Sequence, residues 1–143
     1  MSDNKLKDMS QSFGYLVLLG MIVWPFMVTL GPKLEGRLAP VVVGTHLTRV
    51  VPDDETHSLV YGSSTKRREC TYLKMEWFYG EPNGQHVLLP LEIMERSRIR
   101  ENGEFGFGPW RLNLNADLVR DESFALVYHR CHPLWDTVTE FWP

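Results

Sequence analysis

The sequence lacks the motifs that carry most enzyme chemistry. The glycine-rich segment Gly103 to Gly108 (GEFGFG) has no G-K-[S/T] ending and precedes strand-like sequence, so it is not a phosphate-binding loop. An acidic turn, Asp53-Asp54-Glu55, lies near His57, but no nucleophile–base pair or paired carboxylate stands out. The chain also has no repeat, no low-complexity run and no N-x-[S/T] glycosylation sequence. We therefore expect a non-enzymatic protein without a cofactor.

The sequence also lacks a large excess of either positive or negative charge. The formal net charge of −3 gives no general attraction to nucleic acid, so no nucleic-acid partner is expected. Two local basic clusters exist, and acidic neighbours offset both; they are Lys66-Arg67-Arg68 beside Glu69, and Arg96, Arg98 and Arg100 beside Glu95 and Glu101. These patterns predict solvated, self-compensating surfaces, with contact to lipid headgroups or an acidic partner as the alternative.

One long stretch has no charged residue at all. It runs from Phe13 to Leu30, and as a helix it would extend roughly 27 Å, close to the hydrocarbon thickness of a bilayer. We predict a transmembrane helix over residues 13–31 that contacts the lipid bilayer, and Pro25 is expected to kink it. A cleaved signal peptide is one alternative, but this run is longer than usual and no A-x-A-like site follows. A buried core helix is the other, although the following sequence offers no helical partner.

The orientation of this helix follows from weaker signals. Lys5 and Lys7 precede it while Lys33 and Arg37 follow it, so the positive-inside count is nearly balanced. The two cysteines and the short N-terminal tail favour the N-terminus inside. We expect an inner-membrane, single-pass protein with a periplasmic or extracellular C-terminal domain.

The remaining chain divides by composition. Residues 1–12 are a polar tail, Gly31-Pro32 is expected to end the helix, residues 32–40 form a connector, and residues 41–143 form one domain. Short runs with β-branched residues or period-2 alternation follow at 8–12-residue spacing. The expected strands are 41–51 with a bend at Gly44, 57–61, 69–79, 86–94, 110–114, 123–130 and 137–142. We predict an all-β sandwich of about seven strands, with Asn83-Gly84 turning a hairpin at positive φ and Pro90 marking an edge or a bulge.

The stretch from Trp110 to Cys131 resembles a corner of immunoglobulin-like domains. There an alternating strand, a turn containing Asp and Ser, and a Tyr shortly before a Cys follow one another, and Asp121, Ser123, Tyr128 and Cys131 occupy the matching places. The gap from Tyr to Cys is three residues here and two in the family, and Trp77 follows Cys70 more closely than usual. The resemblance implies an immunoglobulin-like architecture and says nothing about function.

The two cysteines have two readings. A Cys70–Cys131 disulfide would close a loop of about 60 residues and, from the strand alternation, would join neighbouring strands rather than cross the core. Two buried free thiols are the alternative. A copper or zinc site, or a redox role, at His129, Cys131 and His132 is a further hypothesis, but the spacing matches no closed zinc site and no Met follows Met94.

The segment Cys131 to Pro143 (CHPLWDTVTEFWP) resembles the C-terminal ends of small single-pass membrane proteins of tailed bacteriophages. That resemblance implies origin more than role. The leading hypothesis is a membrane-anchored protein-binding or accessory structural subunit of a membrane or phage assembly, with Phe105, Phe107, Trp135 and Trp142 as surface contacts. The alternatives are the metal or redox carrier and a phage lysis or exclusion effector that acts on the membrane.

Overall fold

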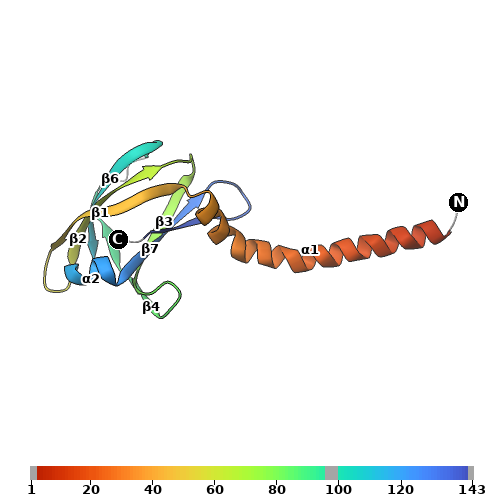
Figure 1. The fold of residues 1–143 in the computed structure, drawn as a ribbon, viewed down its shortest axis with the longest axis horizontal. Coiled ribbons are helices and arrows are strands. Elements are labelled where there is room, and N and C mark those ends of the chain that lie inside the picture. Colours follow the sequence, from red (N-terminus) through yellow and green to blue (C-terminus); the bar gives the residue numbers. More distant parts are fainter. Residues whose placement is uncertain (1–2, 96–99, 142–143) are drawn as a thin grey trace.

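The computed structural model describes residues 3–95 and 100–141, and it places one long helix before a β-rich domain (Figure 1). The elements in chain order are α1 (Asp3–Leu38), β1 (Val42–Pro52), β2 (Ser58–Lys66), β3 (Thr71–Gly80), β4 (His86–Leu89), β5 (Leu91–Ile93), β6 (Gly103–Leu112), α2 (Ala116–Asp121), β7 (Ser123–Arg130) and β8 (Thr137–Phe141). The helix projects away from the domain along the long axis of the molecule.

The strands form two antiparallel sheets of four strands each. One has the order β1-β2-β6-β5 and the other the order β4-β3-β7-β8. Both sheets contribute to one hydrophobic core, to which α2 adds Val119; its buried members are Leu47, Val60, Trp77, Phe107, Trp110, Leu112, Val119, Ala125 and Phe141. A mostly β domain behind an apolar N-terminal helix is confirmed, with eight strands in the described residues where about seven were expected, and with one short helix, α2, inside the domain.

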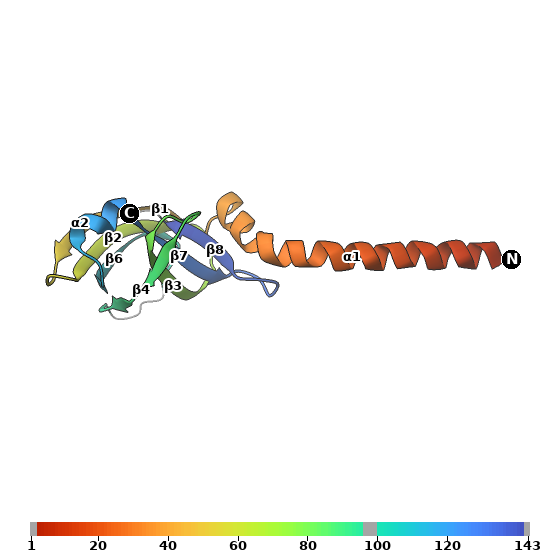
Figure 2. The ribbon, with the colours of Figure 1, turned by 90° about the horizontal axis from the view of Figure 1, so that it is seen from below.

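Helix α1 is longer than predicted. The segment Gln11–Leu38 is long and apolar enough to cross a membrane, and none of its apolar window is buried by the rest of the chain. The expected end at Gly31-Pro32 and the expected connector over residues 32–40 are wrong as secondary structure, because the helix continues to Leu38. Pro32 lacks the N–H that would bond one turn back, which bends a helix without necessarily ending it. Figure 2 shows the last turns of α1 at an angle to the rest.

The first two strands confirm one prediction and correct another. Strand β1 has register shifts between Val43 and His46 and a positive φ at Gly44, as expected for a bent strand. Strand β2 does not end at Tyr61 but continues through Gly62 to Lys66. It continues because its second half pairs with both β1 and β6, and the Ser64 and Thr45 hydroxyls lie 2.7 Å apart in hydrogen-bond contact.

The predicted single strand over residues 86–94 is two strands in different sheets. β4 pairs with β3, whereas β5 pairs with β6, and Pro90 separates them. Proline has no N–H for a ladder, so pairing stops there and the chain crosses from one sheet to the other. The β3–β4 hairpin is present as predicted, but the positive φ lies at Gly80 rather than at Asn83-Gly84.

Helix α2 was not predicted. Asn115 caps its N-terminus by accepting a hydrogen bond from the Asp117 N–H. The helix leads into Ser123, whose hydroxyl accepts from the buried Trp77 indole at 2.9 Å and donates to the Val119 carbonyl. The expected turn at Asp121 and Ser123 is therefore a helix end that satisfies the polar atom of the largest core side chain.

Candidate functional site

The most specific set of polar contacts in the described residues lies where α1 meets the domain. The last turns of α1 pack on β8 so closely that a Cβ at Gly36 would lie 1.7 Å from the Val138 carbonyl oxygen. Five residues earlier, a Cβ at Gly31 would lie 3.1 Å from the Trp135 ring. These two glycines let the helix backbone approach the strand and the β7–β8 loop directly.

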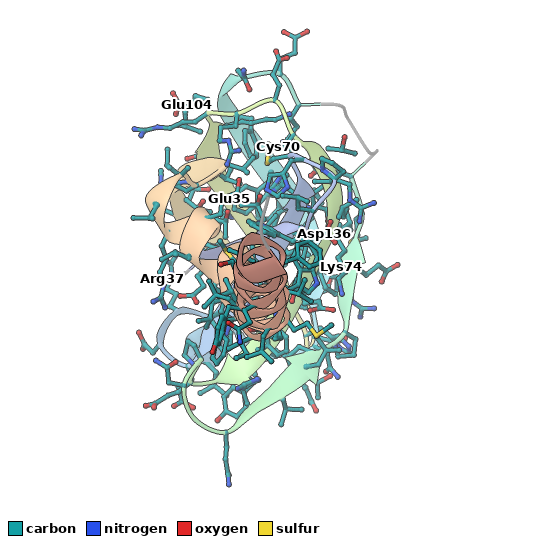
Figure 3. All side chains as sticks on the ribbon, turned by 90° about the vertical axis from the view of Figure 1, so that its right-hand side faces the viewer. Glu35, Arg37, Cys70, Lys74, Glu104 and Asp136 are labelled. Atoms are coloured by element: carbon teal, nitrogen blue, oxygen red, sulfur yellow. A yellow bond between two sulfur atoms is a disulfide. The ribbon has the colours of Figure 1, made fainter. Side chains whose placement is uncertain are left out.

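Glu35 is the centre of this junction. Its Oε1 accepts from the Arg68 guanidinium at 2.8 Å, and its Oε2 accepts from the His132 Nε2 and the Trp135 indole, each at 2.9 Å. The Glu35 side chain is 16 % exposed. Figure 3, which looks along the helix from its N-terminal end, shows Glu35 beside the last turns of α1 and Arg37 on their outer side. A carboxylate with three donors from two separate loops fixes both the position and the rotation of the helix end.

Neighbouring contacts identify the protonated nitrogen of His132 and a second acceptor for Arg68. The Leu134 N–H donates to the Nδ1 atom of His132 at 3.3 Å, so the Nε2 atom carries the proton given to Glu35. Arg68 also donates to the Ala39 carbonyl at 2.8 Å, satisfying an acceptor at the helix end. We refer to Glu35, Arg68, His132 and Trp135 as the Glu35 cluster.

The disulfide lies directly behind this cluster. Cys70 and Cys131 are bridged, as predicted, and their Cα atoms are 4.5 Å apart. They flank the paired residues Thr71 and Arg130, so the bridge joins the ends of the neighbouring strands β3 and β7. Arg68 stands two residues before one cysteine and His132 one residue after the other. The covalent link therefore holds the two loops that supply donors to Glu35 at a fixed separation.

We expect Glu35→Ala to weaken the docking of α1 by about 2–3 kcal/mol, because three donors lose a shared acceptor in a largely buried site. Hydrogen exchange of the amides of residues 36–39 in detergent-solubilised protein measures this loss as faster exchange. Glu140→Ala is the matched control. The Glu140 carboxylate lies 3.5 Å from the Arg37 guanidinium, and the Arg37 side chain is 67 % exposed, so this ion pair should contribute less than about 1 kcal/mol. Equal effects of the two substitutions would contradict the assignment.

The proposed metal ligands have separate structural roles. Cys131 is in the disulfide, His132 donates to Glu35, and His129 is buried with an Nδ1 atom that has no hydrogen-bond partner among the described residues. Nowhere in residues 3–95 and 100–141 are three or more His, Cys, Asp or Glu side chains grouped to hold a metal ion. The structure gives the metal hypothesis no geometric support.

His129 predicts an acid-sensitive domain. Its burial, with a smaller effect of the Lys66 charge, lowers the pKa of His129 from 6.5 to about 4. Between these two values the unfolded chain binds a proton at His129 that the folded domain does not, so stability falls as the pH drops from about 6.5 to about 4. We expect a loss of up to about 3 kcal/mol over this range. Urea unfolding at several pH values should show it, and a His129→Phe variant with an unchanged slope would contradict the cause.

The predicted contact residues do not form one surface. Phe107 is only 5 % exposed and stacks on Trp110 with ring centroids 4.2 Å apart, so its prediction as a surface contact is wrong. Gly62 explains this, because a Cβ there would occupy the space of the Phe107 ring. Phe105 is partly buried under the Arg100 guanidinium, 4.4 Å from the ring centroid. Trp135 belongs to the Glu35 cluster, and Trp142, Arg96 and Arg98 lie outside the described residues.

The acidic turn has a structural explanation. The Asp54 carboxylate accepts from the backbone N–H groups of Thr56 and His57, which, with the hydrogen bond to the His57 ring, keep its pKa well below the usual range. Arg111 binds Asp53 and Asp54 at 2.7 and 2.9 Å. The His57 Nδ1 atom faces both the Thr56 hydroxyl and the carboxylate, so the ring cannot pass a proton from one to the other through its two nitrogens. These contacts close the β1–β2 loop.

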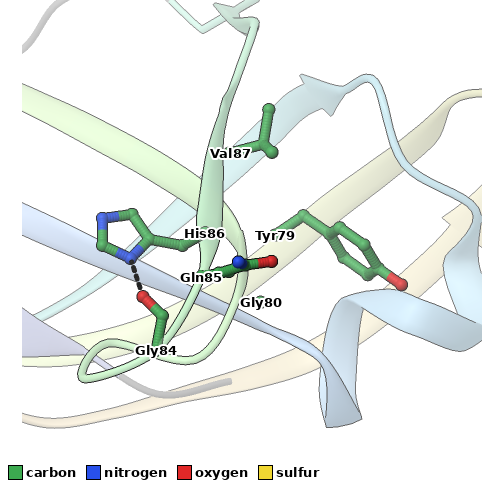
Figure 4. A pocket seen from close by; sticks show the side chains of 6 residues that line it. All are labelled: Tyr79, Gly80, Gly84, Gln85, His86 and Val87. Carbon is green, nitrogen blue, oxygen red and sulfur yellow. Dashed lines mark hydrogen bonds between the residues drawn. The ribbon is translucent and has the colours of Figure 1, made fainter.

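An open hollow at the β3–β4 hairpin offers no reactive pair either (Figure 4). Its lining is Tyr79, Gly80, Gly84, Gln85, His86 and Val87. The Tyr79 hydroxyl donates to Glu122, the C-cap residue of α2, at 2.6 Å, and the His86 Nδ1 atom is 3.1 Å from the Gly84 carbonyl oxygen within the hairpin. Both polar groups are therefore engaged in structural contacts.

Comparison of the chain with protein-family models, with curated proteins and with solved structures finds no match.

The Glu35 cluster was not predicted from the sequence, but one signal pointed to it. A glutamate in the last turn of a helix faces the negative end of the helix dipole, which is unfavourable unless a specific partner compensates. Here Arg68 supplies that compensation from a loop 33 residues further along the chain.

Proposed function

We propose that this protein is a single-pass membrane protein whose C-terminal domain is held in a fixed orientation on its anchor and binds another protein, without enzymatic activity. The observation that carries this proposal is the Glu35 cluster. A flexible tether would need no such contacts, whereas a carboxylate with three donors, a helix–strand approach through Gly36 and a disulfide behind them make the helix end part of the domain. Fixed orientation serves a domain that must meet a partner in the same membrane or assembly.

We also propose that the domain is an immunoglobulin-like β-sandwich. The sheet orders β1-β2-β6-β5 and β4-β3-β7-β8 correspond to A-B-E-D and C′-C-F-G when the strands are lettered in chain order. The fully buried Trp77 on the third strand adds support, because that family buries a Trp on strand C. The disulfide departs from the family, since it joins neighbouring strands of one sheet rather than the two sheets.

The proposed compartment is extracytoplasmic, with the N-terminus inside and the anchor in the inner membrane. Disulfides persist in oxidising compartments, and the Cys70–Cys131 bridge supports that location for the domain. The apolar helix Gln11–Leu38 supports the anchor.

A relationship to small single-pass proteins of tailed phages remains part of the proposal. It is supported by the Cys-His-Pro-Leu-Trp sequence at residues 131–135. Three of these five residues have roles at the junction: Cys131 in the disulfide, and His132 and Trp135 in binding Glu35. The partner would then be a phage or host membrane protein.

The proposed partner surface is the edge formed by β4 and β5. Both are edge strands, one in each sheet, and they are joined at Pro90. Val87 and Leu88 on β4 are 64 % and 57 % exposed, and Ile93 and Met94 are exposed at the other end of the same segment. Exposed apolar residues gathered on edge strands are typical of protein contact surfaces.

Purification from mild detergent tests this function. The tagged full-length protein should retain a stoichiometric partner, and Leu88→Glu should lose it. Thr48→Glu is the matched control, because Thr48 is exposed on β1, at the edge of that sheet opposite β5. Recovery of no stoichiometric partner, or equal loss in both variants, would contradict the proposal. Toxicity from residues 1–40 expressed alone would instead favour the lysis effector.

A further inference from the structure

The loop between β7 and β8, residues 131–136, extends beyond the sheets along the anchor. Figures 1 and 2 both show it on the side of the domain from which α1 leaves. Its Trp135 ring packs against α1 at Gly31, directly after the uncharged run that ends at Leu30. The loop therefore reaches the level of the helix at which the most apolar part of the chain ends.

The tip of this loop is apolar and exposed. Pro133 and Leu134 are both exposed, Leu134 to 59 %. Leu30, at the end of the apolar run, is exposed to the same degree. The loop thus adds an apolar tip next to the end of the anchor's own apolar surface.

The loop is also held in place on both sides of this tip. The Trp135 indole donates to Glu35 and the Leu134 N–H donates to His132, while Arg130 and Asp136 form an ion pair at 2.8 Å across its base. Leu134 is therefore exposed on a loop whose neighbouring polar groups already have hydrogen-bond or ion-pair partners. A side chain held this way loses little conformational freedom when it is buried in a second environment.

We infer that the β7–β8 loop is a second membrane contact, in which Pro133 and Leu134 enter the boundary between headgroups and acyl chains. The occupant is the bilayer because the loop tip continues the surface of the proposed anchor, which already defines where the lipid lies. Apolar side chains beside aromatic and basic residues are favourable at this depth, and Lys33 is exposed two residues beyond Gly31. The inference rests on the proposed membrane anchor. It means that the domain lies against the membrane surface at a set tilt.

A site-specific fluorescent label tests this contact. A cysteine introduced as Leu134→Cys in the full-length, oxidised protein is labelled with an environment-sensitive nitrobenzoxadiazole group, and the protein is reconstituted singly into phosphatidylcholine–phosphatidylglycerol nanodiscs. We expect the label at residue 134 to emit at shorter wavelength and several-fold more strongly than the same fluorophore attached to a small soluble thiol in buffer. We also expect lipids that carry a nitroxide near the headgroup to quench this emission. Glu55→Cys, in the exposed β1–β2 loop at the far end of the domain, is the control and should show neither effect.

Leu16→Cys separates the two proposals. Quenching of a label at residue 16 but not at residue 134 would overturn the loop contact and leave the anchor intact. Absence of quenching at residue 16 would overturn the anchor and the loop contact together. A blue shift at residue 134 that appears only when several chains share one bilayer would show self-association, and it would also overturn the lipid contact.

Discussion

Removal of the Cys70–Cys131 disulfide should lower the free energy of unfolding of the domain by about 4 kcal/mol. The bridge joins cysteines 61 residues apart, and the loss follows from the greater chain entropy of an unfolded state without that closed loop. The domain has a modest core, so a loss of this size is a large part of its stability. Urea unfolding of the full-length Cys70→Ser, Cys131→Ser double variant, followed by tryptophan fluorescence, measures it.

The same double variant should also loosen the junction. Arg68 and His132 stand close to the two cysteines, so opening the bridge lets the loops that carry them move apart. We expect hydrogen exchange in the last turn of α1 to accelerate together with exchange at the ends of β3 and β7. A variant with the stability of the unmodified protein would contradict a structural role for the bridge.

Gly36→Ala should undock the helix end from β8, with a cost of about 3 kcal/mol or more. The added Cβ would lie 1.7 Å from the Val138 carbonyl oxygen, and backbone on both sides cannot move aside as a flexible side chain would. Alanine is otherwise the better helix former, so the expected effect has the opposite sign to the ordinary one. Thermal unfolding in detergent and hydrogen exchange over residues 32–38 measure the change.

Gly20→Ala is the matched control within the same helix. Nothing lies within 4 Å of a Cβ at that position, so the substitution should be neutral or stabilise the helix by up to about 1 kcal/mol. If both substitutions were neutral, the close packing of α1 on β8 would be refuted.

The features that the sequence predicted correctly depend on local pattern. A helix over the uncharged run was predicted correctly, because the run is long and apolar without needing any distant partner. Strand β7 was predicted with its observed bounds, Ser123–Arg130, because its residues alternate between the two faces of a sheet. The disulfide was one of two interpretations of the cysteines, and the strand alternation correctly placed it between neighbouring strands.

The features that were missed depend on partners distant in the chain. Helix α1 passes Pro32 because β8 and the Glu35 cluster support its last turns, and no local signal reveals that support. Phe107 looked like a surface residue in a glycine-rich segment, but its ring fills the space over Gly62 on the neighbouring strand. The split at Pro90 required knowing that β6, rather than β3, would pair with the residues that follow.

The junction changes how the anchor is understood. An apolar helix followed by a flexible connector would only hold the domain near the membrane. If the helix spans a membrane as proposed, an end fixed by Glu35 and Gly36 also determines which surface of the domain faces the bilayer. The orientation of the domain relative to the helix is therefore set by this chain's own contacts.

The state of the two thiols in intact cells tests the central claim most directly, namely that the domain is disulfide-bonded and lies outside the cytoplasm. Cells are quenched with acid, free thiols are blocked under denaturing conditions, and thiols released by subsequent reduction are labelled with a maleimide that retards the protein on a gel. We expect Cys70 and Cys131 to be labelled only after reduction, with the double serine variant as the unlabelled control. Cysteines that are already free and blocked at the first step would contradict both the bridge and the extracytoplasmic location.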